Sequence, residues 1–324
     1  MQAQTKVQAA LISIALVTAT PAALSQETAY PKKGNVEITV LFPAGSSADI
    51  TARLLAQGMS RHLGANVITV NRPGAGGAIG YKHAAAQKPD GYSLVWNSNS
   101  ISTTYHSGQL PFDYKSFDPV ARVLVEPPLL AVRADGKWKK LADLVADAKA
   151  YPGQMTVANS GTGSHTHITA VAMFKAAGLN VIHVPYSAAQ VVPNLIGGHV
   201  DTMVQLPGAL AAHVASGRIR ILAALTASRD PGMPDVPTAR ELGYNVTMEA
   251  WRGIAVPRGT PPAVIARLEA AIRATATSPE FSAASDKLYV RPAFLPAEAF
   301  GRMIAKEDAE MAGIMRQIGL KKSP

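Results

Sequence analysis

The segment VEITVLFPAGSSADITARLLAQGMSRHLGANVITV (residues 36–70) decides the fold class, because two different periodicities flank a loop of small residues. Residues 36–42 form a short β-branched and apolar run, which favours a strand. Apolar residues then recur at helical spacing, at Ala52, Leu55, Ala56, Met59 and Leu63. Gly64 is placed to end that helix, and a second β-rich run follows at residues 67–70. The segment therefore predicts a strand–helix–strand unit with parallel strands.

The same alternation continues along the chain and is interrupted by two proline-rich breaks. A helix at residues 78–86 and a strand at residues 92–97 complete a βαβαβ unit. A second alternating set begins after Glu126-Pro127-Pro128, and a strand at residues 253–256 follows the second break at residues 231–237. The two breaks indicate two crossovers between two domains. We expect an α/β fold in which each domain is a mostly parallel sheet flanked by helices, built from residues 26–128 with 249–324 and from residues 129–248.

The composition excludes several classes of protein. The chain has 324 residues, enough for two domains, and its 48% hydrophobic content is typical of a globular protein. It contains no cysteine, which excludes disulfide scaffolds, thiolate catalysis and cysteine-ligated metal sites. The net charge is +9, but the basic residues form only short runs and no nucleic-acid-binding motif. We therefore expect no nucleic-acid partner, and the charge favours anionic small molecules.

Residues 1–25 have the pattern of a signal peptide for export. Lys6 is the only charged residue among them, residues 7–17 are largely apolar, and Ala23-Leu24-Ser25 is a small-x-small cleavage site. The alternative is an amphipathic first helix of the fold, but the segment lacks a polar face. No apolar run clearly reaches the ~18 residues that a membrane span needs. We expect cleavage near Ser25 and Gln26 and a periplasmic location, which also suits the absence of cysteine.

The loop after the first strand has the composition of an anion-binding site. In doubly wound sheets, ligands bind beyond the carboxyl ends of the strands, so loops that follow strands are the informative ones. Small residues here allow a ligand to approach the backbone, and amides at the start of the next helix attract anions. The ordinary alternative is a capped turn. The candidate ligand-binding residues in this loop are Phe42, Ala44, Gly45, Ser46, Ser47 and Asp49.

The glycine-rich loop at residues 71–80 superficially resembles a dinucleotide fingerprint. Its spacing is G-x-G-G-x-x-G rather than G-x-G-x-x-G, and no acidic residue ends the next strand. The Lys-Ser/Thr pair of a P-loop is also missing. We therefore expect an anion-binding or simply tight loop, with Gly76, Gly77 and Ala78 as candidates and Gly77 giving the backbone its closest approach to a ligand.

The loop at residues 159–167 gathers hydroxyl groups, glycines and a helix start, which together offer many donors to an anion. The candidates are Ser160, Gly161, Thr162, Gly163, Ser164 and His165. A serine nucleophile and a His-x-His metal site are competing interpretations. The chain has no G-x-S-x-G elbow, and no third metal ligand is marked, so we expect neither metal nor cofactor.

Four further polar residues lie at the ends of other predicted strands. Asn97 and Tyr186 follow strands and offer a side chain to a ligand, whereas Asp201 and Gln205 flank the strand at residues 202–204. Each of them also fits a structural role in a turn. We expect Asn97, Tyr186 and Gln205 to help set specificity.

Together these loops resemble the Bug-type periplasmic receptors of tripartite tricarboxylate transporters. The resemblance runs in collinear order from about Tyr30 to the C-terminus, and Asn71-Arg72-Pro73-Gly74-Ala75-Gly76-Gly77 is its most specific part. The other matching motifs are residues 42–49, Pro89-Asp90-Gly91-Tyr92, residues 160–164, Val184-Pro185-Tyr186, residues 197–201 and Trp251-x-Gly253-x-x-x-Pro257-x-Gly259-Thr260-Pro261.

The resemblance implies a two-domain, Venus-flytrap binding protein without enzymatic activity. Such a receptor closes on a small organic carboxylate between its domains, holds it largely through amides, hydroxyls and waters, and delivers it to the membrane permease. The loops here agree with this chemistry, because donors are plentiful and the first, third and fourth loops contain no arginine. We expect a monomer.

Two departures from the family pattern bear on the ligand. The usual Gly-Gly of the first loop is Gly45-Ser46 here, and the usual Tyr-Lys-Gly is Tyr186-Ser187-Ala188, which removes a cation from the cleft. His165 is also untypical. We therefore expect a dicarboxylate or an aromatic carboxylate rather than a tricarboxylate. The alternatives are a periplasmic hydrolase that uses serine and histidine, and a carboxylate sensor that signals to a membrane kinase.

Overall fold

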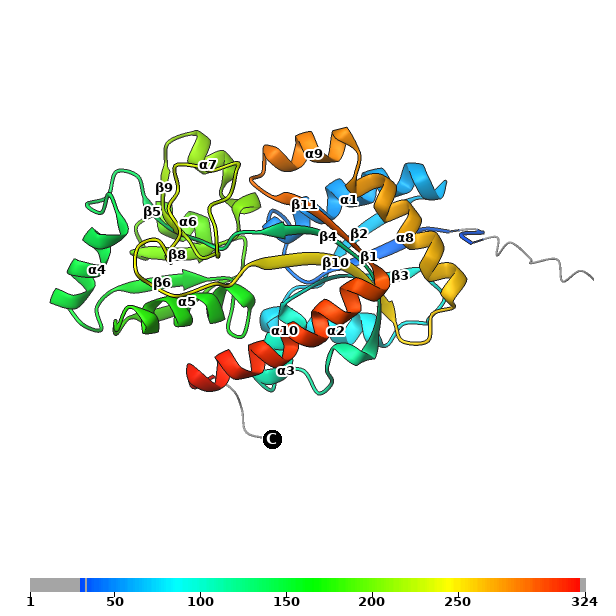
Figure 1. The fold of residues 1–324 in the computed structure, drawn as a ribbon, viewed down its shortest axis with the longest axis horizontal. Coiled ribbons are helices and arrows are strands. Elements are labelled where there is room, and N and C mark those ends of the chain that lie inside the picture. The colour runs from blue at the N-terminus through cyan, green and yellow to red at the C-terminus, as the bar shows by residue number, and fades with distance from the viewer. Residues whose placement is uncertain (1–29, 33, 321–324) are drawn as a thin grey trace, which may run out of the picture.

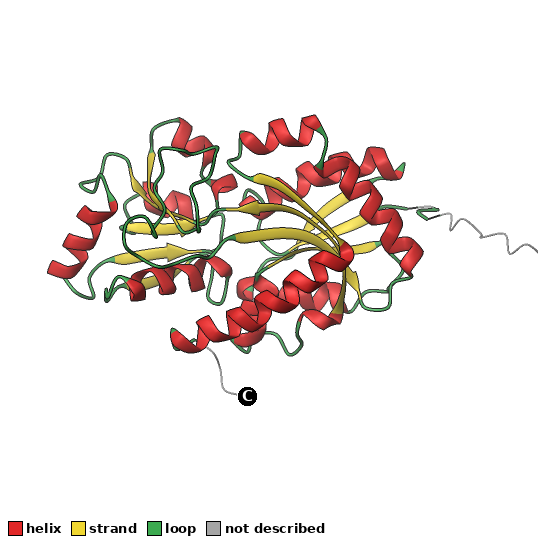
Figure 2. Ribbon diagram, viewed as in Figure 1, coloured by secondary structure: helices red, strands yellow, loops and turns green. Residues whose placement is uncertain are grey.

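The computed structural model describes residues 30–32 and 34–320, which fold into two α/β lobes joined by two extended crossings (Figures 1 and 2). The expected signal peptide and its cleavage site lie outside the described residues. No helix within the described ranges is long and apolar enough to cross a membrane.

The first lobe is built on a six-stranded sheet with the order β11-β4-β10-β3-β1-β2. Its strands are β1 (Val36–Val40), β2 (Val67–Asn71), β3 (Ser93–Ser98), β4 (Phe117–Glu126), β10 (Ala250–Pro257) and β11 (Arg291–Pro296). Its helices are α1 (Ser47–Leu63), α2 (Ala78–Ala85), α3 (Ser100–His106), α8 (Pro262–Ala276), α9 (Pro279–Asp286) and α10 (Ala297–Gln317), with single turns η1 (Ala75–Gly77) and η2 (Tyr114–Ser116). The βαβαβ unit predicted for residues 36–97 is present.

The second lobe is a five-stranded sheet with the order β7-β6-β8-β5-β9. Its strands are β5 (Leu129–Arg133), β6 (Thr156–Asn159), β7 (Ile182–Pro185), β8 (Thr202–Gln205) and β9 (Ile219–Ala224). Its helices are α4 (Leu141–Ala150), α5 (His165–Ala176), α6 (Val191–Ile196) and α7 (Ala211–Ala215), with a single turn η3 (Pro207–Ala209).

The two-domain α/β fold is confirmed, but each sheet is mixed rather than mostly parallel. β1 pairs in parallel with β2 and β3, and β6 pairs in parallel with β7 and β8. The antiparallel pairs involve the strands at the crossings, because β4 leaves the first lobe and β10 returns to it beside β3 and β4, while β11 and β9 pair antiparallel with β4 and β5 at the sheet edges. The returning strand therefore runs against its neighbours, which matters for the site described below.

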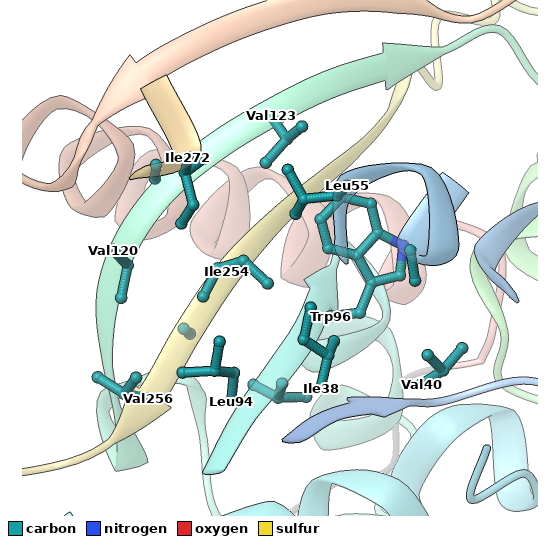
Figure 3. Packing of buried hydrophobic residues seen from close by; sticks show 14 of the residues in the cluster. Ile38, Val40, Leu55, Leu94, Trp96, Val120, Val123, Ile254, Val256 and Ile272 are labelled. Atoms are coloured by element: carbon teal, nitrogen blue, oxygen red, sulfur yellow. The ribbon is translucent and has the colours of Figure 1, made fainter. Parts of the chain in front are cut away.

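The core of the first lobe lies between its sheet and the covering helices. Ile38, Leu94 and Ile254 come from the adjacent strands β1, β3 and β10 and pack near Leu55 of α1 (Figure 3). Every residue of β10 is buried. Such nearly continuous apolar runs are expected where helices cover both faces of a sheet.

Helix α10 packs on both lobes (Figure 1). Phe300 and Ile304, in its first half, belong to the core of the first lobe. Met311 and Met315, in its second half, belong to the core of the second lobe. The C-terminal helix is thus a third connection between lobes, beside the two crossings.

Candidate functional site

A narrow pocket lies between the two lobes, and we call it the inner pocket. The first lobe contributes Phe42, Ser46, Ser47, Ala48, Ser98, Asn99, Ser100, Ala250 and Arg252, and the second contributes Ser160, Ser164, His165, Thr166, Ala188, Gln205 and Leu206. Its volume is about 20 Å³, so little room is left between the two lobes at this point. The inner pocket is therefore the size of one small polar group.

A wider space, here called the outer cleft, continues from the inner pocket past Phe42, Ser160 and Ala188, which line both. The volume of the outer cleft is about 620 Å³. Its remaining lining residues are Pro43, Pro73, Gly74, Ala75, Gly76, Gly77, Gln109, Gly161, Thr162, Pro185, Tyr186 and Ser187. None of these described residues carries a charge.

Asp49 organises the first loop rather than facing the pocket. Its carboxylate accepts hydrogen bonds from the Gly45 amide at 3.1 Å and from Asn71 Nδ2 at 2.9 Å, and it pairs with Arg53. Burial alone would raise the pKa of Asp49, but the bonds from Arg53, Asn71 and Gly45 outweigh it and lower the pKa. The loop is thereby fixed with the Ser46 side chain as the N-cap of α1.

The loop before α5 is fixed in a similar way. The Ser164 hydroxyl accepts a bond from the His167 amide at 3.2 Å, and His167 Nδ1 accepts one from the Gly163 amide at 3.2 Å. Burial lowers the pKa of His167 to about 4, so this imidazole is neutral and acts as an acceptor within the loop. Thr166 Oγ1 accepts from the Ser160 amide at 3.0 Å.

These caps leave the starts of two helices from opposite lobes directed at one pocket. The amides of Ser47 and Ala48 open α1, and those of His165 and Thr166 open α5. Amides in the first turn of a helix have no intrahelical acceptor. All four residues line the inner pocket, where the helix dipoles add a favourable potential for an anion.

His165 is the polar side chain in this pocket with the most unused hydrogen-bonding capacity. It is 5% exposed, and neither ring nitrogen has a partner among the described residues. Burial, with a smaller contribution from the nearby Arg252 cation, lowers the pKa of His165 to about 3. A neutral imidazole with a free donor and a free acceptor therefore faces the inner pocket.

Arg252 is the charged residue of this pocket that the sequence reasoning missed, together with uncharged lining residues such as Asn99 and Thr166. Its Nε donates to Glu126 at 2.8 Å, and the Ser47 hydroxyl donates to the other oxygen of the same carboxylate. The side chain of Arg252 is 4% exposed, and its guanidinium lies 5.9 Å from the centre of the Phe42 ring. The available signal was the position between Trp251 and Gly253 in a recognised motif, but Arg252 lies in a strand rather than in a loop that follows one.

The structure brings many of the predicted residues together and separates others. Those lining the inner pocket are Phe42, Ser46, Ser47, Ser160, Ser164, His165 and Gln205, and those lining the outer cleft also include Gly76, Gly77, Gly161, Thr162 and Tyr186. Neither lining includes Ala44, Gly45, Asp49, Ala78, Asn97, Gly163 or Asp201.

Two of these separated residues have clear structural roles. Asn97 Oδ1 accepts from the Tyr81 hydroxyl at 2.8 Å. The Asp201 carboxylate accepts from the amide and the hydroxyl of Thr156, both at 2.8 Å. Asp201 precedes β8, so it lies at the opposite end of that strand from Gln205.

The lobes touch at the outer cleft near the Thr162 carbonyl. Gln109 Nε2 donates to the Thr162 carbonyl at 3.0 Å. A side chain at Gly76, whose φ is +63°, would place its Cβ 2.8 Å from that same carbonyl oxygen. Gly76 is thus a point of close approach between the lobes, whereas a Cβ at Gly77 would make only ordinary contacts with the protein, the nearest 3.5 Å away. The approach to a ligand expected at Gly77 stays a prediction.

Ser160 and Ser164, the serines of the loop before α5, are bonded to other partners than an imidazole ring. The Ser160 hydroxyl donates to Gln205 Oε1 at 3.2 Å, and the Ser164 hydroxyl contacts Thr166 and the His167 amide. Neither hydroxyl is hydrogen-bonded to an imidazole, as a serine nucleophile would require. Within residues 30–32 and 34–320, no three histidine or carboxylate side chains are gathered to hold a metal ion.

Comparison with known proteins identifies the family. Residues 51–320 match the model of the tripartite tricarboxylate transporter family receptor, TctC. Protein BugT of Bordetella pertussis is 32% identical over 318 residues, which cover 96% of this chain and 97% of BugT. Two solved structures are also similar. Rpa4515 of Rhodopseudomonas palustris with adipate is 26% identical with a TM-score of 0.85, covering 90% of this chain and 98% of that one.

The second solved structure is MatC (Rpa3494) from Rhodopseudomonas palustris with bound malate. It is 25% identical to this chain with a TM-score of 0.80, and the match covers 86% of this chain and 98% of MatC. These relatives are solute-binding proteins and not enzymes. The chain therefore belongs to the tripartite tricarboxylate transporter receptor family, as its Bug-type motifs predicted.

Proposed function

We propose that this protein is a periplasmic receptor that binds a small organic carboxylate, either a dicarboxylate or an aromatic carboxylate, between its lobes. It delivers this ligand to the permease of a tripartite tricarboxylate transporter. Membership of the receptor family supports the transport role. The adipate and malate named for two similar structures support the carboxylate class.

The observation that carries the proposal is the convergence of α1 and α5 on the inner pocket. Each helix offers its opening amides to the pocket, and the two helices come from different lobes. A carboxylate bridging them would be held by charge-assisted bonds from both sides. Ligand binding would thereby favour the closed arrangement of the lobes.

A thermal-shift screen tests the carboxylate class. The purified protein is scanned with mono-, di- and tricarboxylic acids and aromatic acids, with the matching amides as controls. A ligand at 100 times its dissociation constant adds about 2.7 kcal/mol to the free energy of unfolding. A rise in melting temperature with some acids and none of their amides supports the proposal, and a flat panel with folded protein contradicts it.

The transport role has its own test. Ligand-loaded protein is used to capture partners from detergent-solubilised membranes, with ligand-free protein as the control. Enrichment of permease subunits supports delivery to a transporter. Enrichment of a membrane kinase instead would assign the same pocket to signalling. Size-exclusion chromatography with light scattering tests the expected monomer.

A further inference from the structure

The inner pocket and the outer cleft differ in charge, although they are neighbours that share Phe42, Ser160 and Ala188 as lining residues. Arg252 is the one charged side chain that lines the inner pocket, in the part of the chain that the structure describes, once His165 is taken as neutral. The outer cleft has no charged lining residue within the same ranges. A bound molecule therefore meets a cation at one end only.

The guanidinium of Arg252 is held so that part of it stays available. Glu126 takes the Nε hydrogen, and the Phe42 ring lies against the guanidinium. The hydrogen bond to Glu126 uses Nε rather than either Nη atom, and the side chain is only 4% exposed. A guanidinium offers its donors as a planar fork that fits a carboxylate. Because Nε is held by Glu126, the two Nη groups are the ones that could donate to a carboxylate.

His165 gives an independent indication of a ligand at the same place. Both of its ring nitrogens are buried without a partner, and the residue lines the inner pocket with Arg252. Buried polar groups are normally hydrogen-bonded, so an imidazole without partners in a pocket indicates a missing polar group. A carboxylate on Arg252 would accept the imidazole hydrogen.

The dimensions of the two spaces favour one orientation of the ligand. The inner pocket is the narrower of the two, and the outer cleft has more room. A carboxylate in the inner pocket must therefore extend the rest of the molecule past Phe42 and Ser160 into the outer cleft. There it meets prolines, glycines and Tyr186 but no cation.

We infer that the ligand enters with its carboxylate against Arg252 and His165 and places an uncharged body in the outer cleft, so that the receptor prefers acids with a single negative charge. This inference rests on the proposed carboxylate-binding function and narrows it. A second carboxylate in the outer cleft would lose water without gaining a cation, whereas an uncharged ring or chain would gain contact with Phe42 and Tyr186.

Isothermal titration calorimetry with matched acids tests the preference. Benzoate is compared with terephthalate, and hexanoate with adipate, since each pair differs by a carboxylate at the far end. We expect each monoacid to bind at least about tenfold more tightly than its diacid. Equal or tighter binding of both diacids overturns the inference while leaving the proposed function intact. No binding of any carboxylic acid by folded protein overturns the proposed function itself.

Variants of the buried pair test the role of Arg252. Glu126→Gln with Arg252→Gln removes both charges together, so that neither is left buried alone, and is expected to weaken monoacid binding about a hundredfold. Arg252→Lys keeps the charge without the fork and is expected to weaken it about tenfold. Glu298→Gln with Arg302→Gln removes an exposed pair on α10 and serves as the matched control, with unchanged affinity.

Circular dichroism and thermal unfolding establish that each variant is folded. Unchanged affinity in folded Glu126→Gln/Arg252→Gln protein overturns the assignment of Arg252. If that variant does not fold, Arg252→Lys decides, because unchanged affinity there contradicts recognition by the guanidinium fork. A loss in the control pair equal to that in the buried pair also contradicts it.

Discussion

Gly76 brings the backbone of the first lobe close to that of the second, and Gly76→Ala is expected to hold the lobes apart. A Cβ at this position would lie 2.8 Å from the Thr162 carbonyl oxygen and 3.0 Å from backbone atoms of Gly163 and Ser164. These atoms belong to backbone and cannot turn aside as a side chain can. Restoring an ordinary contact of 3.4 Å requires the lobes to separate by roughly 0.6 Å at this point.

That separation has a calculable effect on binding. Hydrogen bonds between a carboxylate and the opposing helix starts have optimal lengths of about 2.9 Å, so an added 0.6 Å weakens the bonds from one lobe. Weakening two such bonds costs about 2 kcal/mol, which is about thirtyfold in the dissociation constant. Alanine at a φ of +63° adds about 1 kcal/mol of backbone strain, which lowers stability rather than affinity.

Gly64→Ala is the matched control. Gly64 has a φ of +68° at the end of α1, and a Cβ there meets nothing within 4 Å. Both variants should lose about 1 kcal/mol in urea unfolding, but only Gly76→Ala should lose affinity in calorimetry with the tightest-binding acid. If Gly76→Ala binds as tightly as Gly64→Ala, contact between the loops does not limit closure and the reasoning fails.

Three further changes test other parts of the site. Asp49→Ala should lower the free energy of unfolding by about 2 kcal/mol and weaken acid binding, because the Gly45 amide loses its acceptor and the first loop loosens. Urea unfolding that matches the unmodified protein would contradict this. Ser160→Ala should weaken binding by less than about tenfold, since its hydroxyl already donates to Gln205, and a hundredfold loss in calorimetry would show that the hydroxyl turns to the ligand. Burial raises the pKa of Glu307 from 4.5 to about 7, so the folded state retains a proton that the unfolded state releases, and stability should fall between about pH 4.5 and 7. In Glu307→Gln, the difference in the free energy of unfolding between pH 5 and pH 8, measured with urea, should be smaller by up to about 3 kcal/mol. A difference equal to that of the unmodified protein would contradict the raised pKa of Glu307.

The sequence alone was sufficient to predict those parts of the site whose residues are neighbours in the chain. The loop after β1 and the loop before α5 could be found because strand, small residues and helix start follow one another directly. Their caps are also local, with Ser46 and Asp49 within one turn of each other. Anion binding by these loops would depend on the starts of α1 and α5 meeting at one pocket from different lobes. No pattern that is local in the sequence shows this meeting.

Asp201 and Arg252 show where rules about strand ends fail. Asp201 lies before a strand that is parallel to β6, so it is carried to the edge away from the ligand. Arg252 lies near the start of β10, but β10 is antiparallel to β3, and Arg252 pairs with Ser98 at the end of β3. An antiparallel return strand brings its beginning to the edge where parallel strands end. The direction of β10 was not predictable from its own residues.

The position of β10 also determines when the first lobe can form. This strand, residues 250–257, lies between β3 and β4, which pair with it and not with each other. The strands β5 to β9 of the second lobe, in contrast, come from the continuous stretch 129–224. The middle of the sequence can therefore complete its sheet from one continuous stretch of chain. The sheet of the first lobe instead stays divided between β3 and β4 until β10 joins them, so this lobe depends on a strand that lies more than a hundred residues beyond β4.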